Sequence, residues 1–225
     1  MGSASFNPNN NSYRDKLRIL LILYFFSEKI IQDESTDKNL AKIFKSEVRI
    51  QKIDFLIRYP DYLAYELLDL LNKAEFAHLK QEVKEQVKRI FNSNEPEIRR
   101  EEMLRYFFGA YEEIDHIIAF FISTGFVVYK SKKNMVGREF NKLYYLTNYG
   151  VNKIDTEILK KLDKAKWYEE RCGLIKKYFG DLTGTELKVR QYEHEQYRNT
   201  PINKYIKGIQ EEVKSKFHEL FGEEL

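Results

Sequence analysis

Hydrophobic and polar positions alternate along most of this chain with the period of an α-helix. In residues 110–125, apolar side chains recur every three or four positions, at Ile114, Ile117, Ile118, Phe121 and Ile122. This spacing puts them on one helical face, and Thr124-Gly125 is typical of a helix C-terminus. We therefore predict a helix that ends at Gly125.

The pattern changes directly after this helix. Residues 126–130 and 143–146 are rich in β-branched and aromatic side chains, which predicts the two strands of a hairpin. A polar, basic loop joins the strands, and a further helix begins near Thr147. Helix, strand, basic loop, strand and helix in this order are typical of a winged helix, in which the hairpin is called the wing.

The rest of the chain reads as helical, with boundaries set by proline, glycine and short polar stretches. The predicted helices are residues 12–31, 38–44, 48–59, 60–71, 76–91, 98–108, 151–162, 164–179, 184–198 and a last one from Pro201. Pro60 ends one helix and begins the next. Residues 97–147 then read as helix, turn, helix and wing.

We expect a mainly α-helical fold with one β-hairpin, in which a winged helix is embedded between N- and C-terminal helical segments. The polar stretch 92–96 is the best candidate for an internal boundary. The predicted segments are a flexible leader over residues 1–12, an N-terminal helical region over 13–95, the winged helix over 96–150 and C-terminal helices over 151–225.

The charge of the chain limits its interaction with nucleic acid. The net charge is only +3, whereas proteins whose affinity rests on many phosphate contacts are usually more basic. Any DNA contact is therefore expected to be local and independent of sequence; an ordinary solvated hairpin is the competing interpretation. The expected DNA-binding residues, in the wing and just before it, are Lys130, Lys132, Lys133, Arg138, Lys142, Arg99, Arg100 and Arg105.

The helix before the wing argues against base reading. A helix that reads the major groove presents Arg, Lys, Asn or Gln to base edges. Here residues 110–125 contain no Lys or Arg and offer Glu112, Glu113, Asp115 and His116. Carboxylates would be repelled by phosphates, so sequence-specific readout by this helix is not expected.

Cysteine usage and hydropathy indicate the compartment. Cys172 is the only cysteine, which excludes an intrachain disulfide and favours a reducing cytoplasm. No signal peptide opens the sequence, and its longest apolar run, residues 19–26, is far shorter than a membrane span. We expect a cytoplasmic protein without a membrane contact.

Catalytic and metal-binding patterns are weak. The histidines, His78, His116, His194 and His218, are far apart in the sequence. Glu193, His194 and Glu195 are consecutive and fit a solvated helix face, while Cys172 fits a small buried residue. Pro60-Asp61 suggests a metal-dependent nuclease, in which a downstream Glu-x-Lys motif helps to hold magnesium. Glu66 is followed by Leu67-Leu68, so the lysine of that motif is missing. We predict no catalytic residue, metal, cofactor or small-molecule substrate, and hence no enzyme.

A continuous apolar stripe follows Pro201. It consists of Ile202, Tyr205, Ile206, Ile209, Val213 and Phe217, spaced by three or four residues. Three interpretations remain open: the stripe closes the protein's own core, forms a homodimer, or binds a partner protein. Partner binding is the functional prediction, because long terminal helices with such a stripe often dock onto another subunit.

Two family resemblances carry the functional expectation. The block Ile114-Asp-His-Ile-Ile-Ala-Phe-Phe-Ile-Ser-Thr-Gly-Phe-Val, followed by Leu143-Tyr-Tyr-Leu-Thr-Asn-Tyr-Gly150, resembles the wing of PadR-like regulators. This implies a winged-helix transcriptional regulator that binds operator DNA as a homodimer. PadR-like proteins begin directly with the winged helix, whereas here about 95 residues precede it.

The second resemblance covers more of the chain. Leu17-Arg-Ile-Leu-Leu-Ile-Leu-Tyr-Phe and Gln51-Lys-Ile-Asp-Phe-Leu-Ile-Arg-Tyr-Pro-Asp-Tyr-Leu-Ala-Tyr-Glu-Leu-Leu68, with the winged helix, are similar to the middle components of bacterial three-component systems. These systems, including Lamassu-type anti-phage defence, also contain an SMC/Rad50-like ABC ATPase and an effector, often a nuclease. The resemblance implies a non-enzymatic adaptor that bridges the two.

Overall fold

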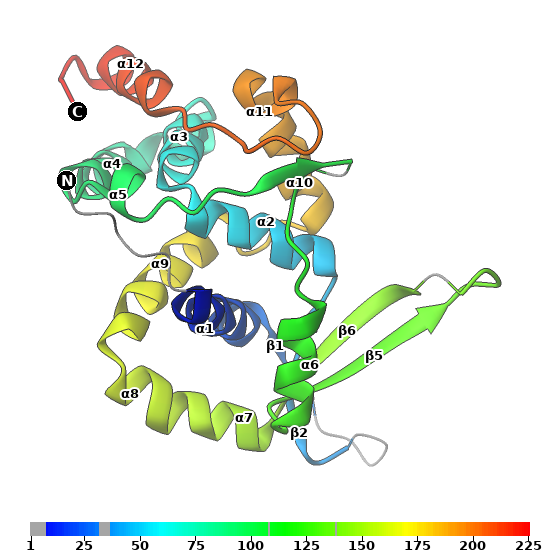
Figure 1. Ribbon diagram of the computed structural model, residues 1–225. Coiled ribbons are helices and arrows are strands. Elements are labelled where there is room, and N and C mark those ends of the chain that lie inside the picture. The colour runs from blue at the N-terminus through cyan, green and yellow to red at the C-terminus, as the bar shows by residue number, and fades with distance from the viewer. Residues whose placement is uncertain (1–7, 32–36, 108, 138) are drawn as a thin grey trace. The chain divides into compact units, whose positions relative to one another are not determined.

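The fold is known from a computed structural model that describes residues 8–31, 37–107, 109–137 and 139–225 (Figure 1). Most of these residues are helical, and the strands form a four-stranded and a two-stranded antiparallel sheet. The prediction of a mainly α-helical fold is confirmed. Arg138 and the first seven residues of the expected leader lie outside the described residues.

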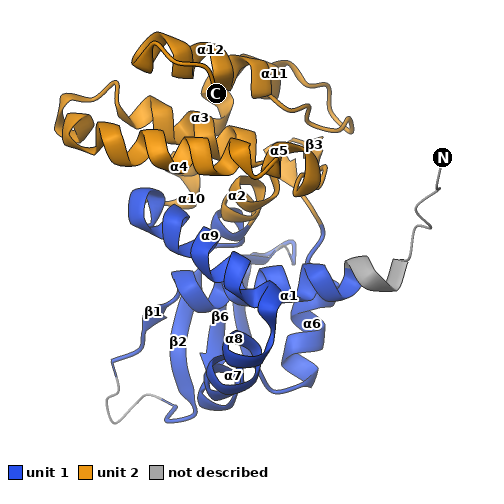
Figure 2. Ribbon diagram, turned by 90° about the vertical axis from the view of Figure 1, so that its left-hand side faces the viewer, with its two compact units in different colours: residues 1–50, 113–180 blue, residues 51–112, 181–225 orange. Residues whose placement is uncertain are grey.

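The chain divides into two compact units, which Figure 2 shows in different colours. Unit 1 takes residues 1–50 and 113–180, and unit 2 takes residues 51–112 and 181–225. Each unit is therefore assembled from two separate stretches, whereas the segments predicted from the sequence are contiguous.

Unit 1 contains the four-stranded sheet and the helices beside it. In chain order its elements are α1 (Pro8–Phe26), β1 (Glu28–Lys29), β2 (Leu40–Lys45), the start of α2 (Glu47–Arg58), α6 (Asp115–Ser123), β5 (Val127–Lys133), β6 (Glu139–Thr147), α7 (Asn148–Lys153), the π-helix η2 (Ile154–Ile158), α8 (Leu159–Lys161) and α9 (Asp163–Phe179). Within the apolar run of α1, residues 19–23 and Phe26 are buried, and Tyr24 and Phe25 are partly exposed. Helix α1 packs against α9, on which Cys172 is also buried, as expected.

The sheet of unit 1 has the strand order β1-β2-β6-β5, with antiparallel pairing throughout. The predicted hairpin is confirmed as β5–β6. The helix predicted over residues 38–44 is wrong, because the chain forms a turn there and then strand β2 between β1 and β6. The six residues of β2 are too few to show a clear period, and pairing with β6 on one edge and β1 on the other decides their conformation.

The predicted N-terminal helix also has different ends. It begins at Pro8 rather than at Ser12, so residues 8–11 of the expected leader are helical. It stops at Phe26, and the polar residues after it form β1 instead of a further helical turn. Pairing of Glu28 with Ile43 of β2 accounts for this early stop.

Unit 2 is built mainly from helices and contains the two-stranded sheet. In chain order its elements are the rest of α2, α3 (Pro60–Leu70), the 3₁₀-helix η1 (Ala74–Leu79), α4 (Lys80–Asn92), α5 (Glu95–Ile98), β3 (Leu104–Tyr106), β4 (Gly109–Tyr111), α10 (Gly184–Glu193), α11 (Glu195–Asn199) and α12 (Gln210–Phe221). Helix α3 contacts α4 and α12.

An aromatic cluster forms the centre of unit 2. Phe55 on α2 and Tyr59, which lies between α2 and α3, stack with ring centroids 4.5 Å apart. Tyr62 and Tyr197 meet Phe55 edge-on. All four side chains are buried. The Tyr59 hydroxyl accepts a hydrogen bond from the Met103 N–H and donates one to the Ile206 carbonyl, 2.9 Å each. The cluster thereby joins three stretches of unit 2 that are distant in sequence.

Two predicted helices are wrong in unit 2. The helix expected over residues 98–108 is not formed: α5 ends at Ile98, and Leu104–Tyr106 form β3, which pairs with β4. The helix–turn–helix expected over residues 97–125 is therefore not formed. The last helix begins at Gln210 rather than Pro201, because residues 203–206 run beside β3, with hydrogen bonds from Arg105 N–H to Lys204 O and from Ile206 N–H to Met103 O.

Most of the apolar side chains of the helices are buried in the cores of the two units. Within the described ranges, no helix combines the length and the apolar character that crossing a bilayer requires.

Candidate interaction surfaces

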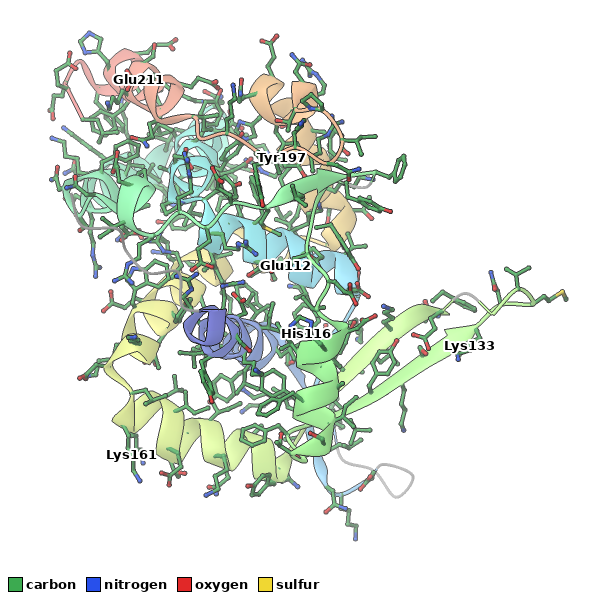
Figure 3. All side chains as sticks on the ribbon, viewed as in Figure 1. Glu112, His116, Lys133, Lys161, Tyr197 and Glu211 are labelled. Atoms are coloured by element: carbon green, nitrogen blue, oxygen red, sulfur yellow. The ribbon has the colours of Figure 1, made fainter. Side chains whose placement is uncertain are left out.

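The wing is the longest hairpin of the described chain. Figure 1 shows β5 and β6 extending beyond the other strands of unit 1, and Figure 3 places Lys133 on this extension. Their register is interrupted by an irregularity between Lys130 and Lys132, opposite Asn141, which has a left-handed backbone (φ 51°). An extra residue at this point bends and twists the outer part of the hairpin.

The predicted wing cations differ in their surroundings. Lys130 and Lys132 are exposed, and Lys133 is exposed and 3.8 Å from Glu139. Lys142 is half-buried and forms ion pairs with Glu47 and Asp115 inside unit 1, and despite its burial these carboxylates raise its pKa. Lys142 is therefore engaged within the unit and is unsuited to contact phosphate. The remaining wing lysines keep their charges at the surface.

The predicted arginines belong to unit 2, not to the unit that carries the wing. Arg99 follows α5, Arg100 lies 3.3 Å from Glu102, and the Arg105 guanidinium donates to the Thr200 carbonyl and lies over the Tyr192 ring. Arg105 thus fixes the chain that follows α11. Its side chain stabilises unit 2, which gives a structural account of this arginine.

Helix α6 is shorter than the predicted helix and presents an acidic start. It begins at Asp115, since Ala110 and Tyr111 belong to β4. Asp115 and His116 are exposed, and Figure 3 labels His116 at the start of α6. Glu112 in unit 2 is instead paired with Arg58. Phe120 is also exposed, with the Lys16 ammonium 5.1 Å from its ring centroid. This surface is acidic and apolar, which does not suit a DNA groove.

A second candidate surface lies on the two-stranded sheet of unit 2. We call it the apolar face and define it as the exposed side chains of Leu104, Tyr106, Phe107, Tyr111 and Tyr205, together with Ile202, which is exposed in the turn before Tyr205. Leu104 pairs with Tyr111 across β3–β4 and with Tyr205 on its other side. The rings of Tyr106 and Tyr111 are 5.8 Å apart.

Strand alternation separates this face from the core. Met103, Ala110 and Ile206 are buried on the inner side of the sheet, while their neighbours Leu104, Tyr111 and Tyr205 point outward. The Ala110 N–H donates to the Tyr197 hydroxyl at 2.5 Å. The Tyr197 hydroxyl thus already binds a backbone N–H of β4. We therefore expect a partner to lie across the face rather than to add a strand to the sheet.

The C-terminal stripe is only partly available for binding. Ile206, Ile209, Val213 and Phe217 are buried within unit 2, so the prediction that they bind a partner is wrong for the folded unit. They close the protein's own core: the Ile206 N–H donates to Met103 O beside β3, the Ile209 N–H donates to Asp61 on α3, and α12 packs on α3. Ile202 and Tyr205 remain exposed and belong to the apolar face.

Most residues of the apolar face are not predicted from the sequence. Leu104, Tyr106, Phe107 and Tyr111 were assigned to two helices, although a signal for a hairpin was present. Gly109 separates two short stretches of aromatic and aliphatic residues, and its backbone is left-handed (φ 101°). A side chain there would also collide with the Tyr197 hydroxyl. Glycine at this position is therefore required by the turn and by the close approach of Tyr197.

The acidic residues considered as nuclease candidates are structural. Asp61 is buried, and its carboxylate accepts hydrogen bonds from the backbone N–H groups of Tyr62 and Ile209. Glu66 is also buried and binds Arg190 Nε at 2.5 Å and His194 Nε2 at 2.9 Å. The expectation that His194 lies on a solvated helix face is wrong, because it is buried against Tyr62 and Tyr65.

One further ionisable group lies under the apolar face. Lys52 on α2 is buried, and its ammonium is 3.3 Å from the Ala110 carbonyl of β4. Burial, with a smaller contribution from Lys188, lowers the pKa of Lys52 to about 7. A lysine with this pKa changes charge near neutrality, which links the base of the short hairpin to pH.

An open groove of about 560 Å³ beside α12 is lined partly by Tyr65, Glu212 and Lys216. In the described part of the chain, no group of three or more His, Cys, Asp or Glu residues is arranged to hold a metal. The groove therefore offers no recognisable chemistry.

Comparison with known protein families, with curated proteins and with solved structures found no significant match to this chain. The surfaces described above are therefore the basis for a functional proposal.

Proposed function

We propose that this chain is a non-enzymatic adaptor of a bacterial anti-phage defence complex, bridging an SMC/Rad50-like ATPase and an effector nuclease. The observation that carries the adaptor role is the apolar face of unit 2. The identity of the partners rests on the sequence resemblance. A weak, sequence-independent contact between the wing and DNA completes the proposal.

The size of the apolar face favours a protein partner. Six half-exposed side chains, four of them aromatic, offer on the order of 600 Å², since an aromatic side chain can bury 150–250 Å². The largest apolar patch of a typical monomer is about 300–600 Å², and one side of a stable interface is roughly 800 Å². The face is thus large enough to form the centre of an interface.

The composition of the face favours protein over nucleic acid. Tyrosine is enriched at protein interfaces because its ring is apolar and its hydroxyl can hydrogen-bond. Leu104 and Ile202 add aliphatic surface, on which bases do not stack. Glu102, which precedes Leu104 by two residues, is exposed and would repel phosphate. We assign the apolar face to the ATPase contact.

Unit 1 is proposed to be a winged-helix module with an insertion. In this assignment α1, β2, α6 and the β5–β6 wing form the module, and residues 51–112 of unit 2 interrupt it before α6. The sheet order β2-β6-β5 is consistent with three strands of a winged helix. The exposed lysines of the wing support phosphate contact, and the acidic start of α6 argues against operator reading by a PadR-like regulator.

The adaptor role is tested by co-purification with the SMC/Rad50-like ATPase encoded beside this chain. The variant carries Tyr106→Asp and Tyr205→Asp, and we expect at least a tenfold loss of bound ATPase because two charges would be desolvated at the interface. The matched control is Val189→Asp, an exposed apolar position on α10 of the same unit.

Two outcomes would contradict the proposal. Retention of the ATPase by the double variant would show that the apolar face is not the contact. A chromosomal neighbourhood without an ATPase and a nuclease gene would remove the adaptor role. Circular dichroism of each variant establishes that the fold is kept, so a loss of binding is attributable to the surface.

A further inference from the structure

The tip of the wing combines full exposure with apolar side chains. Met135 and Val136 are 107% and 85% exposed, and they occupy the two central positions of a turn. The Gly137 N–H donates to the Asn134 carbonyl at 2.9 Å, and the Val136 N–H donates to the Asn134 side chain at 3.2 Å. Gly137 has the left-handed backbone (φ 78°) that closes such a turn. The turn therefore holds both apolar side chains outward.

Cations surround this tip from one strand. Lys132 and Lys133 immediately precede the turn, Lys130 lies two residues earlier, and all three are exposed. On the opposite strand, Glu139 is held by the Tyr129 hydroxyl at 2.6 Å and lies 3.8 Å from Lys133. The side of the hairpin that carries Lys130 and Lys132 is thus positively charged, and its end is apolar. Phe140, paired with Lys132, adds exposed aromatic surface.

We propose that Met135 and Val136 act as an apolar wedge that enters the minor groove and separates a base step, while Lys130 and Lys132 contact the flanking phosphates. Apolar side chains inserted in this way unstack bases and kink the duplex. The preferred ligand is therefore double-stranded DNA with a step that is already unstacked, such as a bulge, rather than a particular sequence. This inference rests on the proposed contact between the wing and DNA.

Charge and area identify DNA as the occupant of the tip. In a duplex, charged phosphates flank each apolar base step, so lysines can contact the phosphates while the two-residue apolar tip contacts the bases. A lipid surface is less suited, because stable membrane anchoring requires far more buried hydrocarbon than Met135 and Val136 provide. The expected preference follows from the cost of unstacking a base step, which arises in paired DNA and is absent at a bulge.

The test measures binding of the full chain to labelled duplexes by fluorescence anisotropy at about 150 mM salt. One duplex is fully paired, and the other has the same sequence with a two-nucleotide bulge. We expect about tenfold tighter binding to the bulged duplex, since 1.4 kcal/mol corresponds to a factor of ten. Met135→Ser with Val136→Ser should reduce this ratio to about twofold and leave the affinity for paired DNA unchanged.

Charge variants separate the wedge from the DNA contact itself. Lys130→Glu with Lys132→Glu should weaken binding to both duplexes by at least about tenfold and flatten the salt dependence, leaving their ratio unchanged. The matched control, Lys160→Glu with Lys164→Glu, makes the same charge change at exposed lysines elsewhere in unit 1. It should bind like the original protein.

Each remaining outcome contradicts a defined part of the inference. Equal binding to paired and bulged DNA, or a preference that survives in the serine variant, would overturn the wedge while leaving the DNA contact intact. No binding to either duplex would overturn both this inference and the proposed DNA contact. Binding only to phosphatidylserine vesicles would instead assign the tip to a lipid surface.

Discussion

Two hairpins of this protein, β5–β6 in unit 1 and β3–β4 in unit 2, have the same antiparallel pairing but depend on different interactions. The wing has strands of seven and nine residues, and its outer part stands in solvent with its charges exposed. The short hairpin has strands of three residues, and buried side chains such as Tyr59 and Tyr197 bind its backbone from below. The outer part of the wing depends on pairing between its own two strands, whereas the short hairpin depends on contacts with the core of unit 2.

The largest effect is expected where the short hairpin meets the core. Ile206→Asp would bury an unpaired carboxylate on the inner side of the sheet, next to β3, and should lower the free energy of unfolding by at least about 4 kcal/mol. The adjacent Tyr205→Asp, at an exposed position, should change it by less than about 1 kcal/mol. Urea unfolding of both variants measures the difference. Equal effects would show that residues 205 and 206 do not face opposite sides of the sheet.

The next effect depends on pH and on Lys52. Burial lowers the pKa of Lys52 in the folded protein to about 7 from the usual 10.5. Below pH 7 Lys52 is protonated in both the folded and the unfolded state, and the folded state bears the full cost of desolvating the ammonium. Between pH 7 and 10.5 the unfolded state binds more protons than the folded state, so stability rises with pH. The slope approaches about 1.4 kcal/mol per pH unit.

Replacement of Lys52 by methionine should remove this slope. The gain in stability over the original protein is expected to be largest, a few kcal/mol, at or below neutral pH and to diminish as the pH rises. Urea unfolding at a series of pH values provides the measurement. A gain that does not vary with pH would mean that Lys52 is not desolvated under β4.

A smaller effect is expected from one hydroxyl group. Tyr197→Phe leaves the Ala110 N–H and the Gln191 side chain without the oxygen that joins them, at 2.5 Å and 3.1 Å. The loss should be about 1–3 kcal/mol, the usual cost of an unsatisfied buried polar group. Tyr106→Phe removes an exposed hydroxyl from the same sheet and serves as the control, with a change below about 0.5 kcal/mol. Similar stability losses in both variants would contradict the role of the Tyr197 hydroxyl in stabilising the short hairpin.

The smallest effect on stability is expected in the wing. Lys130→Glu with Lys132→Glu changes exposed side chains and should shift the free energy of unfolding by less than about 0.5 kcal/mol per residue. The thermal transition followed by circular dichroism tests this expectation. A large destabilisation would mean that the wing lysines contribute to folding, and the contrast with the short hairpin would disappear.

The sequence predicted those elements that carry their own signal. The helix before the wing and both wing strands were found because apolar spacing and β-branched runs are continuous over many residues. Strand β2 was mistaken for a helix because its conformation is decided by β6, which lies about a hundred residues later. Strand β3 was mistaken for a helix because three residues are too few to reveal a period, and Tyr59 and residues 203–206 determine its conformation.

The candidate surfaces were predictable only in part. Exposed lysines on a predicted hairpin can be identified from sequence, and Lys130, Lys132 and Lys133 are examples. The pairing of Lys142 with Glu47 requires the fold, since 95 residues separate the two. The burial of Ile206 and the exposure of Tyr205 could not be distinguished, because both residues fit the same apolar stripe until the chain is known to be extended there.

The pairing of β2 with β6 has a consequence for synthesis on the ribosome. Strand β2 leaves the ribosome long before residues 139–147 of its partner have been made. At about 5–20 residues per second, the interval is on the order of 5–20 s. During this time only the two-residue strand β1 can cover one edge of β2, and the other edge stays open to a neighbouring nascent chain. Slower translation of residues 51–138 would lengthen this exposure and favour aggregation before the native sheet can close.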